Sequence, residues 1–549
     1  MKLKWKSTLF FFIGVLLLSF LPFLSILTTS LYPHTQDGLV HLARMAAYFR
    51  TITDGEFPVR WAGYLNYGYG MPLFDFIYQV PYFISSFFLL LHVNLVTTYK
   101  LVLVVSFLLS GVFAFLFSKE LFGGTKKALL FTLFYQFAPF RLVELFVRGD
   151  IGEVYTYTFL PLVCFGLVKL SKKISFGTIA LTSLATALLI LSHNSVSLSF
   201  FAVAALFVFF LPFTKKSLMS SFLSLGIGLL LSMFYWAPAL FDHKYTFGDL
   251  FMKNLYLQHF VPFQNFFIPN FFNSPSLRMG GVPIQIGLFH VVAIIVALIV
   301  LIWKKIDTQT KKIFIFSFIL LIASFFLMQP VSNIVWAHVS LLRQFQFPWR
   351  LLSVVVFATS LLSVSFLEVF FVRKVWVYVF LLALVVGSTY WYWRPTYGWD
   401  RVNEDYYWHY PLTSTYYGET DVIWTQGQAT AFPKSPVEFA AGNGTVSRYW
   451  KNSYQQNFQV AAKTKSTLVD HTEYFPGWKV YVNGVQTPIQ FQDQNYRGQI
   501  TFQVPTGKST IKVIFEETPL RLISDIFSLI TLIGLAGLFV IRKVRYGKK

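Results

Sequence analysis

Apolar runs of about 20 residues recur along the whole chain of 549 residues, and they restrict the fold more than any other feature. A helix of that length crosses the hydrocarbon core of a bilayer, which is roughly 30 Å thick. The composition agrees, because 55% of the residues are hydrophobic and only 13% are charged. These values exclude a water-soluble fold, a disordered chain and a coiled coil. We therefore expect a polytopic α-helical membrane protein.

The distribution of Lys and Arg predicts the topology. We expect about twelve spans, at about 8–30, 99–118, 127–143, 154–170, 175–191, 196–213, 217–240, 284–303, 312–330, 350–371, 374–393 and 519–541. Every second connection is rich in Lys and Arg, and these connections contain only two acids, Glu120 and Asp307. Because positively charged loops stay in the cytoplasm, both termini are predicted to be cytoplasmic. The net charge of +21 is thus a topology signal, and no nucleic-acid partner is expected.

The first apolar run follows Lys2, Lys4 and Lys6 and has no small-residue cleavage site, so we expect an uncleaved anchor. Residues 31–98 then form one large first outer loop. Its apolar stretch 71–92 is broken by Pro72 and Pro81, and counting it as a crossing would place most lysine-rich loops outside. A helix pair that lies in the membrane interface or dips partly into it is predicted there.

The segment at about 394–518 differs from the rest of the chain. It contains eleven of the 24 acids, and period-2 patterns replace the apolar runs. A hairpin is predicted from Trp478–Val482, the Asn483–Gly484 turn and Ile489–Phe491, with further strands at 445–450, 456–462, 467–473, 500–504 and 510–515. We expect an extracytoplasmic β-sandwich or jelly roll. It would lie between a transmembrane domain, 1–393, and a last span with a basic tail, 519–549.

Charged residues are almost absent from the centres of the apolar runs, whereas the acids outside the insert gather at the predicted outer face. A charge at the bilayer centre costs roughly 2.5–3.5 kcal/mol on insertion scales, and ion-coupled transporters keep such charges at their binding sites. The distribution therefore disfavours a transporter. It predicts a polar, partly acidic site at the outer membrane boundary.

The segment 34–60 is the richest in candidate residues. Asp37, His41 and Arg44 are spaced i, i+4 and i+7, so a helix that ends near Gly55 places them on one stripe. Asp37 could be a general base that takes a proton from an acceptor hydroxyl, with Arg44 or His41 holding it ionised and oriented. Alternatively, Asp37 is a helix N-cap, and His41 and Arg44 form a solvated face. The spacing leaves both interpretations open.

Several short motifs resemble a known family. They are the segment Tyr32–Phe83, with Asp-Gly-x-x-His-x-x-Arg and Gly-Glu-Phe-Pro-Val-Arg-Trp, then Tyr-Trp-Ala-Pro at 235–238, Gln-Phe-Pro-Trp-Arg at 346–350, and residues 474–484. Together they resemble the bacterial YfhO-type membrane proteins and the 6-pyruvoyl-tetrahydropterin-synthase-related membrane family, which are both similar to GT-C glycosyltransferases. No His-x-His zinc cluster supports pterin chemistry.

The resemblance implies a GT-C-like fold and an inverting glycosyltransferase that uses a polyprenyl-phosphate sugar as donor. The acceptor would be a cell-envelope polymer or glycolipid such as lipoteichoic or teichoic acid, and a donor synthase or flippase is an expected partner. In GT-C enzymes an acid of the first outer loop is the base, and Asp37 matches it. An acidic motif of the second outer loop corresponds to Asp150 and Glu153, for which a polar turn with a local ion pair is the alternative. Asp37, Asp150 and Glu153 could share a divalent cation, Mg²⁺ or Mn²⁺, that neutralises the leaving phosphate.

A lipid phosphate as leaving group calls for cationic residues at headgroup depth. Arg343 and Arg350 lie just before a span, and Arg350 ends the family's Phe-Pro-Trp-Arg, although an interfacial anchor is the alternative for both. His193, at an outer turn, could donate to the phosphate or the acceptor, or be a satisfied turn histidine. With Arg148, which precedes the acidic motif, these residues are assigned to the donor phosphate.

Two other classes of function compete with the glycosyltransferase. A flippase or transporter of a lipid-linked sugar should show mid-span polar residues or paired broken helices. A non-catalytic envelope assembly protein should tolerate changes of the outer acids. The placement of the acids favours the enzyme, while neither the sugar nor the acceptor is encoded in a motif.

Overall fold

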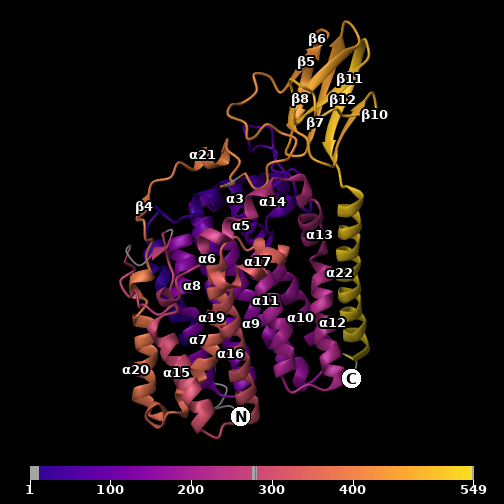
Figure 1. The fold of residues 1–549 in the computed structure, drawn as a ribbon. Helices are drawn as coiled ribbons and strands as arrows, with labels where there is room; N and C mark the ends of the chain where they lie inside the picture. The colour runs from indigo at the N-terminus through magenta and orange to yellow at the C-terminus, as the bar shows by residue number, and fades with distance from the viewer. Residues whose placement is uncertain (1–11, 275–277, 280, 417, 547–549) are drawn as a thin grey trace.

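A helical bundle carries a β domain at one end in the computed structural model, which describes residues 12–274, 278–279, 281–416 and 418–546 (Figure 1). Two parts of the topology prediction lie outside the described residues. They are the N-terminal Lys2, Lys4 and Lys6 and the last residues of the basic tail. The last helix, α22 (Pro519–Tyr546), descends from the β domain along the side of the bundle, where it packs on α12 (Lys215–Leu231) and α13 (Met233–Phe241).

Six helices of the described chain are long and apolar enough to cross a membrane: Leu95–Phe122 (α6), Ile151–Lys172 (α9), Thr308–Leu327 (α16), Pro348–Glu368 (η9, α19 and η10), Val375–Tyr392 (from α20 to η12) and Pro519–Arg542 in α22. Two bent pairs raise the number to eight: α7 (Thr125–Gln136) with Pro139–Arg148, bent by 48°, and α12 with α13, bent by 69°. The prediction of a polytopic helical membrane protein is confirmed.

Four shorter apolar helices coincide with the remaining predicted spans: Phe12–Leu27, Phe176–Ile190 (α10), Asn194–Phe210 (α11 and η3) and Leu288–Trp303 (α15). The count of twelve spans therefore stays a prediction. Short elements fill the long connections: η4 (His243–Tyr245), α14 (Gly248–Met252), η5 (Leu255–His259), η6 (Phe263–Phe266), β2 (Arg278–Met279), β3 (Val282–Pro283), η8 (Pro330–Ser332), α17 (Asn333–His338), α18 (Ser340–Arg343) and η11 (Phe370–Arg373).

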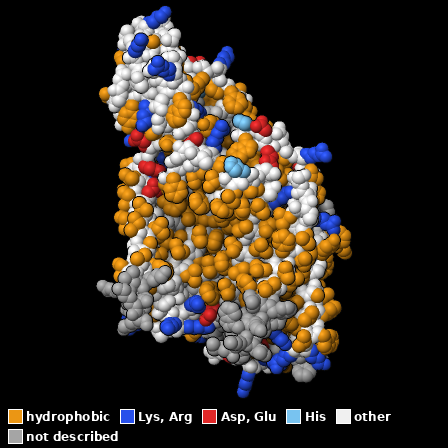
Figure 2. Space-filling model, turned by 180° about the vertical axis from the view of Figure 1, so that it is seen from behind, with side chains coloured by type: hydrophobic (Ala, Val, Ile, Leu, Met, Phe, Trp, Pro, Cys, Tyr) orange, Lys and Arg blue, Asp and Glu red, His pale blue; other side chains and the backbone are white. Residues whose placement is uncertain are grey.

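The lysine-rich connections lie together at the end of the bundle opposite the β domain. Lys172 Nζ is 2.8 Å from Glu120 Oε1, and Lys304 Nζ donates to the Glu368 carbonyl at 3.2 Å, so these contacts join separate connections. Figure 2 shows an apolar band across one face of the helical part, with Lys and Arg below it and on the β domain. The two polar ends of the bundle are thus distinct, while the side of the membrane that each faces stays a prediction.

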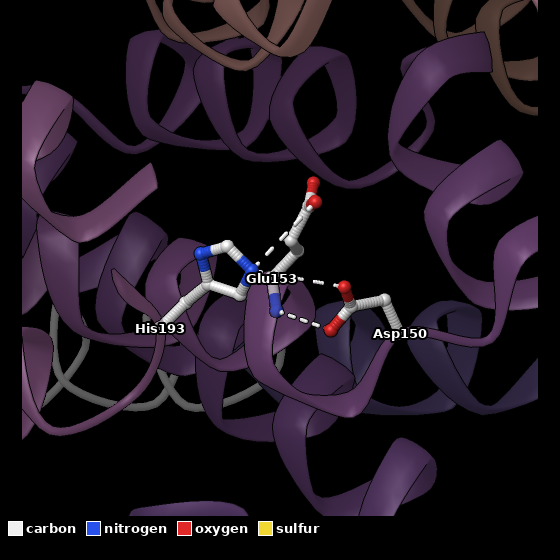
Figure 3. A group of neighbouring side chains, drawn as sticks. All are labelled: Asp150, Glu153 and His193. Atoms are coloured by element: carbon white, nitrogen blue, oxygen red, sulfur yellow. Dashed lines mark hydrogen bonds and ion pairs between the residues drawn. The ribbon is translucent and has the colours of Figure 1, made fainter. Parts of the chain in front are cut away.

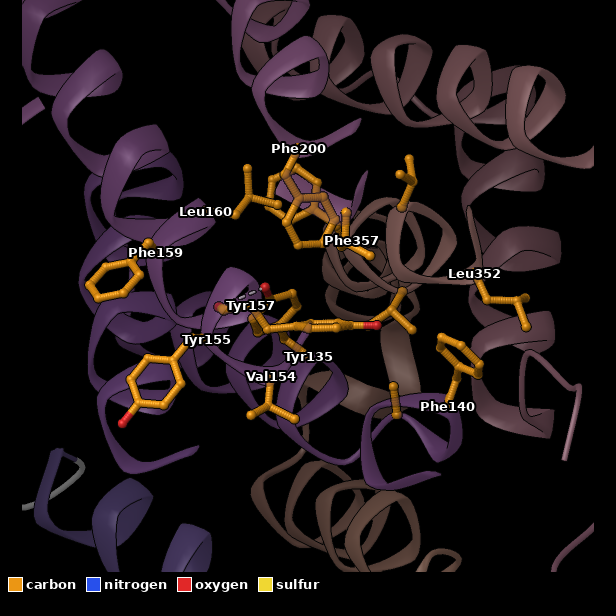
Figure 4. Packing of buried hydrophobic residues seen from close by; sticks show 14 of the residues in the cluster. Tyr135, Phe140, Val154, Tyr155, Tyr157, Phe159, Leu160, Phe200, Leu352 and Phe357 are labelled. Carbon is orange, nitrogen blue, oxygen red and sulfur yellow. Dashed lines mark hydrogen bonds between the residues drawn. The ribbon is translucent and has the colours of Figure 1, made fainter. Parts of the chain in front are cut away.

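The centre of the bundle is packed with aromatic and branched side chains from α7, α9, α11 (Asn194–Phe207) and α19 (Leu352–Leu362) (Figure 4). Tyr157 packs edge-on against Phe200, with ring centroids 5.5 Å apart, and its carbonyl accepts a hydrogen bond of 2.9 Å from the Tyr135 hydroxyl. In lipid, such close packing and interhelical hydrogen bonds hold helices together. This packing fixes α9, whose first turn carries part of the candidate site.

The predicted first outer loop contains β1 (Tyr32–Pro33), α3 (Gly38–Thr53), α4 (Leu73–Phe76) and α5 (Val80–Leu90). The helix expected around Asp37–Gly55 is present, and Gly55 follows it with a φ of 103°, which favours glycine. In the stretch 71–92, α4 and α5 form a pair of short helices, and the 11 residues of α5 are too few to span a bilayer. Their depth in the membrane stays a prediction.

The β domain consists of two antiparallel sheets, with the orders β10-β9-β12-β7-β6 and β11-β8-β5. Its strands are β5 (Val437–Ala441), β6 (Gly444–Lys451), β7 (Gln455–Ala462), β8 (Ser466–Glu473), β9 (Trp478–Val482), β10 (Val485–Thr487), β11 (Gln499–Val504) and β12 (Gly507–Phe515). The strand predicted at Ile489–Phe491 is wrong. Asn483 and Gly484 both have positive φ, so the two-residue turn lets pairing resume at Val485.

Residues 394–416 precede the two sheets and contact the bundle, whereas Trp424 packs against the β domain. There β4 (Trp399–Asp400) pairs with β1. The first residue of α21 (Glu404–Trp408) is Glu404, and its carboxylate accepts hydrogen bonds from the N–H groups of Leu95 and Val96 at 2.8 and 3.0 Å. This carboxylate satisfies free N–H groups at the start of α6. We call residues 411–416 and 418–424 the strap. They contact the first outer loop near one end and the connection after α13 near the other.

A buried charge cluster joins α22 and the β domain to the bundle. Arg60 forms ion pairs with Asp75, Glu517 and Asp525 at 3.1, 2.8 and 2.7 Å. Arg521 pairs with the other Asp75 oxygen at 3.0 Å. We call this group, with Asp242 at 3.4 Å from Arg521, the junction cluster.

Candidate active site

A cavity of about 1110 Å³ opens among α3, α11, α13, residues 340–350 and the strap. We call its charged lining residues Asp37, Arg148, Asp150 and Arg350 the charged side. Its apolar lining residues, which we call the apolar side, include Leu198, Phe201, Leu229, Trp236 and Leu341. A space of this size and character is typical of a ligand-binding site.

Arg148 is the centre of the charged side. Its Nη1 is 2.8 Å from Glu144 Oε2 and 2.6 Å from Glu153 Oε1, and its Nη2 is 3.4 Å from Asp37 Oδ2 and 3.6 Å from Asp150 Oδ2. The Arg148 side chain is only 5% exposed. One guanidinium therefore gathers acids from both loops that the sequence singled out.

The local fold around Arg148 explains this arrangement. Residues Glu144–Arg148 form a π-helical turn, η2, and Gly149 leaves it with a φ of 69°. A Cβ at Gly149 would lie 2.2 Å from the Tyr99 hydroxyl, so only glycine fits. Asp150 then caps α9, since its Oδ1 accepts hydrogen bonds from the N–H groups of Gly152 and Glu153 at 2.8 and 3.1 Å. The segment is more than a polar turn with a local ion pair, because Arg148 also reaches Asp37.

Asp37 faces the cavity with both carboxylate oxygens engaged. Oδ2 faces Arg148, and Oδ1 accepts a hydrogen bond of 3.0 Å from the Tyr416 hydroxyl. Asp37 is the N-cap residue of α3, as the alternative predicted, but its side chain makes no capping hydrogen bond and is engaged at the cavity instead. Burial raises the pKa of the Asp37 carboxyl above its usual value, although Arg148 opposes this shift. A raised pKa suits a general base.

His41 and Arg44 line the cavity, where they contact residues other than Asp37. His41 Nδ1 is 2.9 Å from the Tyr82 hydroxyl, and burial lowers the pKa of His41 to about 3, so the ring is neutral. Arg44 donates to the backbone carbonyl of Ser414 in the strap. Both residues are buried, which excludes the solvated face. Arg148 takes the place that the sequence analysis gave to Arg44 or His41 beside Asp37.

Arg350 and His193 complete the charged side of the cavity, whereas Arg343 does not line the cavity. Arg350 Nε is 2.7 Å from Glu153 Oε1, and Nη1 donates to the Phe345 carbonyl at 2.8 Å. Arg343 donates to backbone carbonyls of Trp336 and Ala337 and is not among the residues that line the cavity. The structure therefore brings Arg350 to the predicted acids and leaves Arg343 apart from them.

Three of these residues could hold a metal ion by their proximity. Ligand atoms of Asp150, Glu153 and His193 lie within 4.8 Å of one another, whereas Asp37, which we had predicted as a ligand, does not belong to this group. Figure 3 shows the His193 ring and the Asp150 carboxylate on two sides of Glu153. Glu153 Oε2 is buried and has no hydrogen-bond partner among the described residues. Burial alone would raise the pKa of Asp150, but His193 and Arg148 outweigh it and hold the pKa below its usual range.

His193 fits a metal less well than the two acids do. Its Nδ1 accepts a hydrogen bond of 3.2 Å from the Val196 N–H, and burial lowers the pKa of His193 to about 4. The neutral ring therefore carries its proton on Nε2, the nitrogen that faces the acids at 3.7 and 3.8 Å. Carboxylate oxygens are the ligands that Mg²⁺ and Mn²⁺ prefer, so Asp150 and Glu153 fit such a cation.

The sequence analysis missed several residues of this region. Glu144 is one of them, although its i,i+4 spacing to Arg148 is a usable sequence signal. Arg141 is fully buried in the bent helix pair, where its guanidinium lies 4.3 Å from the centre of the Tyr157 ring. Tyr416 had no sequence signal, because it is 379 residues from Asp37.

Comparisons with known proteins identify the family of the membrane part of the chain. A family model described as "6-pyruvoyl-tetrahydropterin synthase related domain; membrane protein" matches residues 75–395, which include Arg148 and Arg350 but not Asp37. No curated protein matches the chain. Two solved structures of the arabinofuranosyltransferase AftD from Mycobacteria are similar, a mutant form with a TM-score of 0.41, 14% identity and 70% of this chain covered, and another with 0.40, 15% and 71%. The chain covers 27% of each of those structures.

Proposed function

Because the chain belongs to the membrane-protein family of the 6-pyruvoyl-tetrahydropterin synthase related domain, we propose that its cavity is the active site of a membrane glycosyltransferase. The observation that carries the proposal is the meeting of Asp37 with Asp150, Glu153 and Arg350 around Arg148, at a cavity whose lining also includes apolar residues. Such a cavity suits an amphiphilic donor, with its sugar and phosphate at the charged side and its chain along the apolar side.

The proposed donor is a polyprenyl-phosphate sugar, and the acceptor is a hydroxyl of a cell-envelope polymer or glycolipid, such as lipoteichoic or teichoic acid. Asp37 takes the proton of that hydroxyl while its oxygen attacks the anomeric carbon. The bond from the anomeric carbon to the phosphate oxygen breaks, and polyprenyl phosphate leaves from the opposite side. The reaction therefore inverts the anomeric configuration, and Asp37 ends protonated.

The cationic residues divide their roles according to their contacts. Arg148 is engaged by four carboxylates, so it orients Asp37 and the acids of α9. Arg350 and the Nε2–H of His193 lie beside the same acids at the cavity, where they are suited to donate to the phosphate. Asp150 and Glu153 would hold a divalent cation, which when bound would neutralise charge on the leaving phosphate.

In this proposal twelve spans leave both termini in the cytoplasm, and the cavity and the β domain face outward. The positive-inside pattern of the connections supports this orientation. A synthase or flippase that supplies the donor at the outer leaflet is the partner that this arrangement requires.

The test is Asp37→Asn in the full-length protein, purified in lipid nanodiscs and supplied with polyprenyl-phosphate sugars and envelope polymers. We expect transfer to fall at least 100-fold while donor binding and the unfolding temperature stay near the wild-type values. Asp405→Asn is the matched control, because the Asp405 side chain is 82% exposed. Undiminished transfer in Asp37→Asn would refute the catalytic role. A flippase would instead move lipid-linked sugar across vesicles without transferring it.

A further inference from the structure

The strap crosses the cavity between two fixed ends. Near its start, the Leu412 carbonyl accepts a hydrogen bond of 3.2 Å from the Asn66 N–H. Near its end, the Asp421 carbonyl accepts one of 2.9 Å from the Phe247 N–H. Between these ends, Arg44 holds the strap by its hydrogen bond to the Ser414 carbonyl. The strap residues that line the cavity are Tyr416, Glu419 and Thr420.

Tyr416 reaches from the strap to the proposed base. Its side chain is 55% exposed, yet its hydroxyl lies 3.0 Å from both Asp37 Oδ1 and the Gln36 carbonyl. Arg148 and Tyr416 therefore contact different oxygens of Asp37: Arg148 faces Oδ2, and the Tyr416 hydroxyl donates to Oδ1. That oxygen faces the strap and not the acids of α9.

A hydroxyl that gives its proton to Asp37 must first lie within about 2.6–3.2 Å of a carboxylate oxygen. The Tyr416 hydroxyl already has this distance and donates in the same way. It keeps its proton, because a phenol is a far weaker acid than a carboxyl group and, in the proposed reaction, only the acceptor oxygen bonds to the anomeric carbon as its proton leaves. Tyr416 therefore resembles a bound acceptor hydroxyl that does not react.

We propose that Tyr416 is a gating residue, whose hydroxyl occupies the acceptor position on Asp37 and shields this base from water until an acceptor hydroxyl replaces it. This inference rests on the proposed function. It separates the two substrates in space: the acceptor enters beneath the strap, and the donor approaches along the apolar side. It also gives a reason for the long connection that precedes the β domain, since acceptor contacts with the strap would withdraw Tyr416.

The first test measures the shielding without any substrate. Full-length wild type and Tyr416→Phe in nanodiscs are treated with a water-soluble carbodiimide and glycine ethyl ester, and mass spectrometry follows the labelling of Asp37 relative to the exposed Asp405. We expect Asp37 to be labelled about tenfold faster in Tyr416→Phe, because a hydrogen bond to a charged group is lost. An equal labelling rate in both proteins would overturn the proposal.

Tyr397→Phe is the matched control. The Tyr397 hydroxyl accepts a hydrogen bond of 3.0 Å from the Gln36 side chain, one residue from Asp37, and is on the same surface. Its loss should leave the labelling of Asp37 unchanged. Equal unfolding temperatures of the three proteins show that each is folded, and faster Asp37 labelling in both variants would overturn a specific role of Tyr416.

The second test uses a panel of undecaprenyl-phosphate sugars. Without acceptor, Tyr416→Phe should release free sugar and undecaprenyl phosphate about tenfold faster than wild type, because water then reaches Asp37. With acceptor, the KM for acceptor should fall while kcat stays similar. A loss of both hydrolysis and transfer, or no change in either, would overturn the gate. If wild type shows neither reaction with any donor while the labelling result holds, the proposed function fails and the shielding by Tyr416 stands.

Discussion

The described structure contains two clusters of acids around buried arginines, and they differ in whether they border the cavity. The Arg148 cluster borders the cavity, where Asp37, Asp150 and Arg350 are among the lining residues. In the described structure, none of the residues of the junction cluster around Arg60 and Arg521 lines that cavity. Buried ion pairs are therefore not by themselves a sign of catalysis in this protein.

The difference follows from what each cluster connects. Arg60 and Arg521 tie the first outer loop to α22 and to the connection after α13, so their partners are consumed by joining parts of the fold. Arg148 also joins two loops, but its cluster keeps the Asp37 carboxylate 19% exposed at a cavity. We expect changes in the junction cluster to affect stability first and changes in the Arg148 cluster to affect activity first.

Arg60→Met should have the largest effect on stability. It removes one cation from three acids, and loss of one partner from a buried ion pair typically costs about 3–5 kcal/mol. We expect a lower yield and a clearly lower unfolding temperature in detergent. A normal unfolding temperature with lost transfer would assign the junction cluster to function and break the comparison.

Arg350→Lys should have the next largest effect, and it should appear in donor binding. Lysine cannot reproduce the planar fork of arginine, so we expect the KM for donor to rise about tenfold or more, with a nearly unchanged unfolding temperature. The control is Arg343→Lys, since Arg343 lies outside the cavity lining. An equal rise in both variants would mean that general interfacial charge, not the cavity, is responsible.

Removal of divalent cations should have a moderate effect. We expect EDTA to lower transfer several-fold and Mn²⁺ to restore it, because Asp150, which lines the cavity, and Glu153, which is buried beside it, offer oxygen ligands. Glu153→Gln should weaken Mn²⁺ binding, measured by electron paramagnetic resonance, about tenfold. Junction-cluster variants such as Asp525→Asn should leave Mn²⁺ binding unchanged, and equal binding by Glu153→Gln and wild type would argue against this metal site.

Glu56 should give the smallest effect, beside the junction cluster. Burial raises its pKa from 4.5 to about 8, although the N–H of Trp61 opposes this. The folded state thus binds the proton more tightly, so the stabilisation is present below pH 4.5 and is lost as the pH rises to about 8. In wild type this loss should lower the unfolding temperature as the pH rises from 4.5 to about 8, and we expect Glu56→Gln to lack that contribution. If the unfolding temperatures of Glu56→Gln and wild type depend on pH in the same way, the raised pKa of Glu56 is contradicted.

Sequence patterns predicted the local structure well, and the site only in part. Helices with a suitable run of apolar residues and strands such as Trp478–Val482 are present where expected. Asp37 was identified as a candidate from its helical spacing and the family resemblance, and Asp150 and Glu153 from that resemblance and their predicted place at the outer face. The sequence analysis assigned Asp37 the wrong neighbour and predicted a strand after the hairpin turn a few residues too late.

The reason lies in the range of the forces. The length of an apolar run and its period decide which segments enter lipid and which form sheets, and these are properties of neighbouring residues. Arg60 and Arg148 look alike in the sequence, since each lies within a few residues of acids. Only the tertiary structure decides that one pairs with Asp525 of α22, 465 residues away, and that the other borders a cavity. Ion pairing and burial depend on which distant segments pack together, and no local pattern records that.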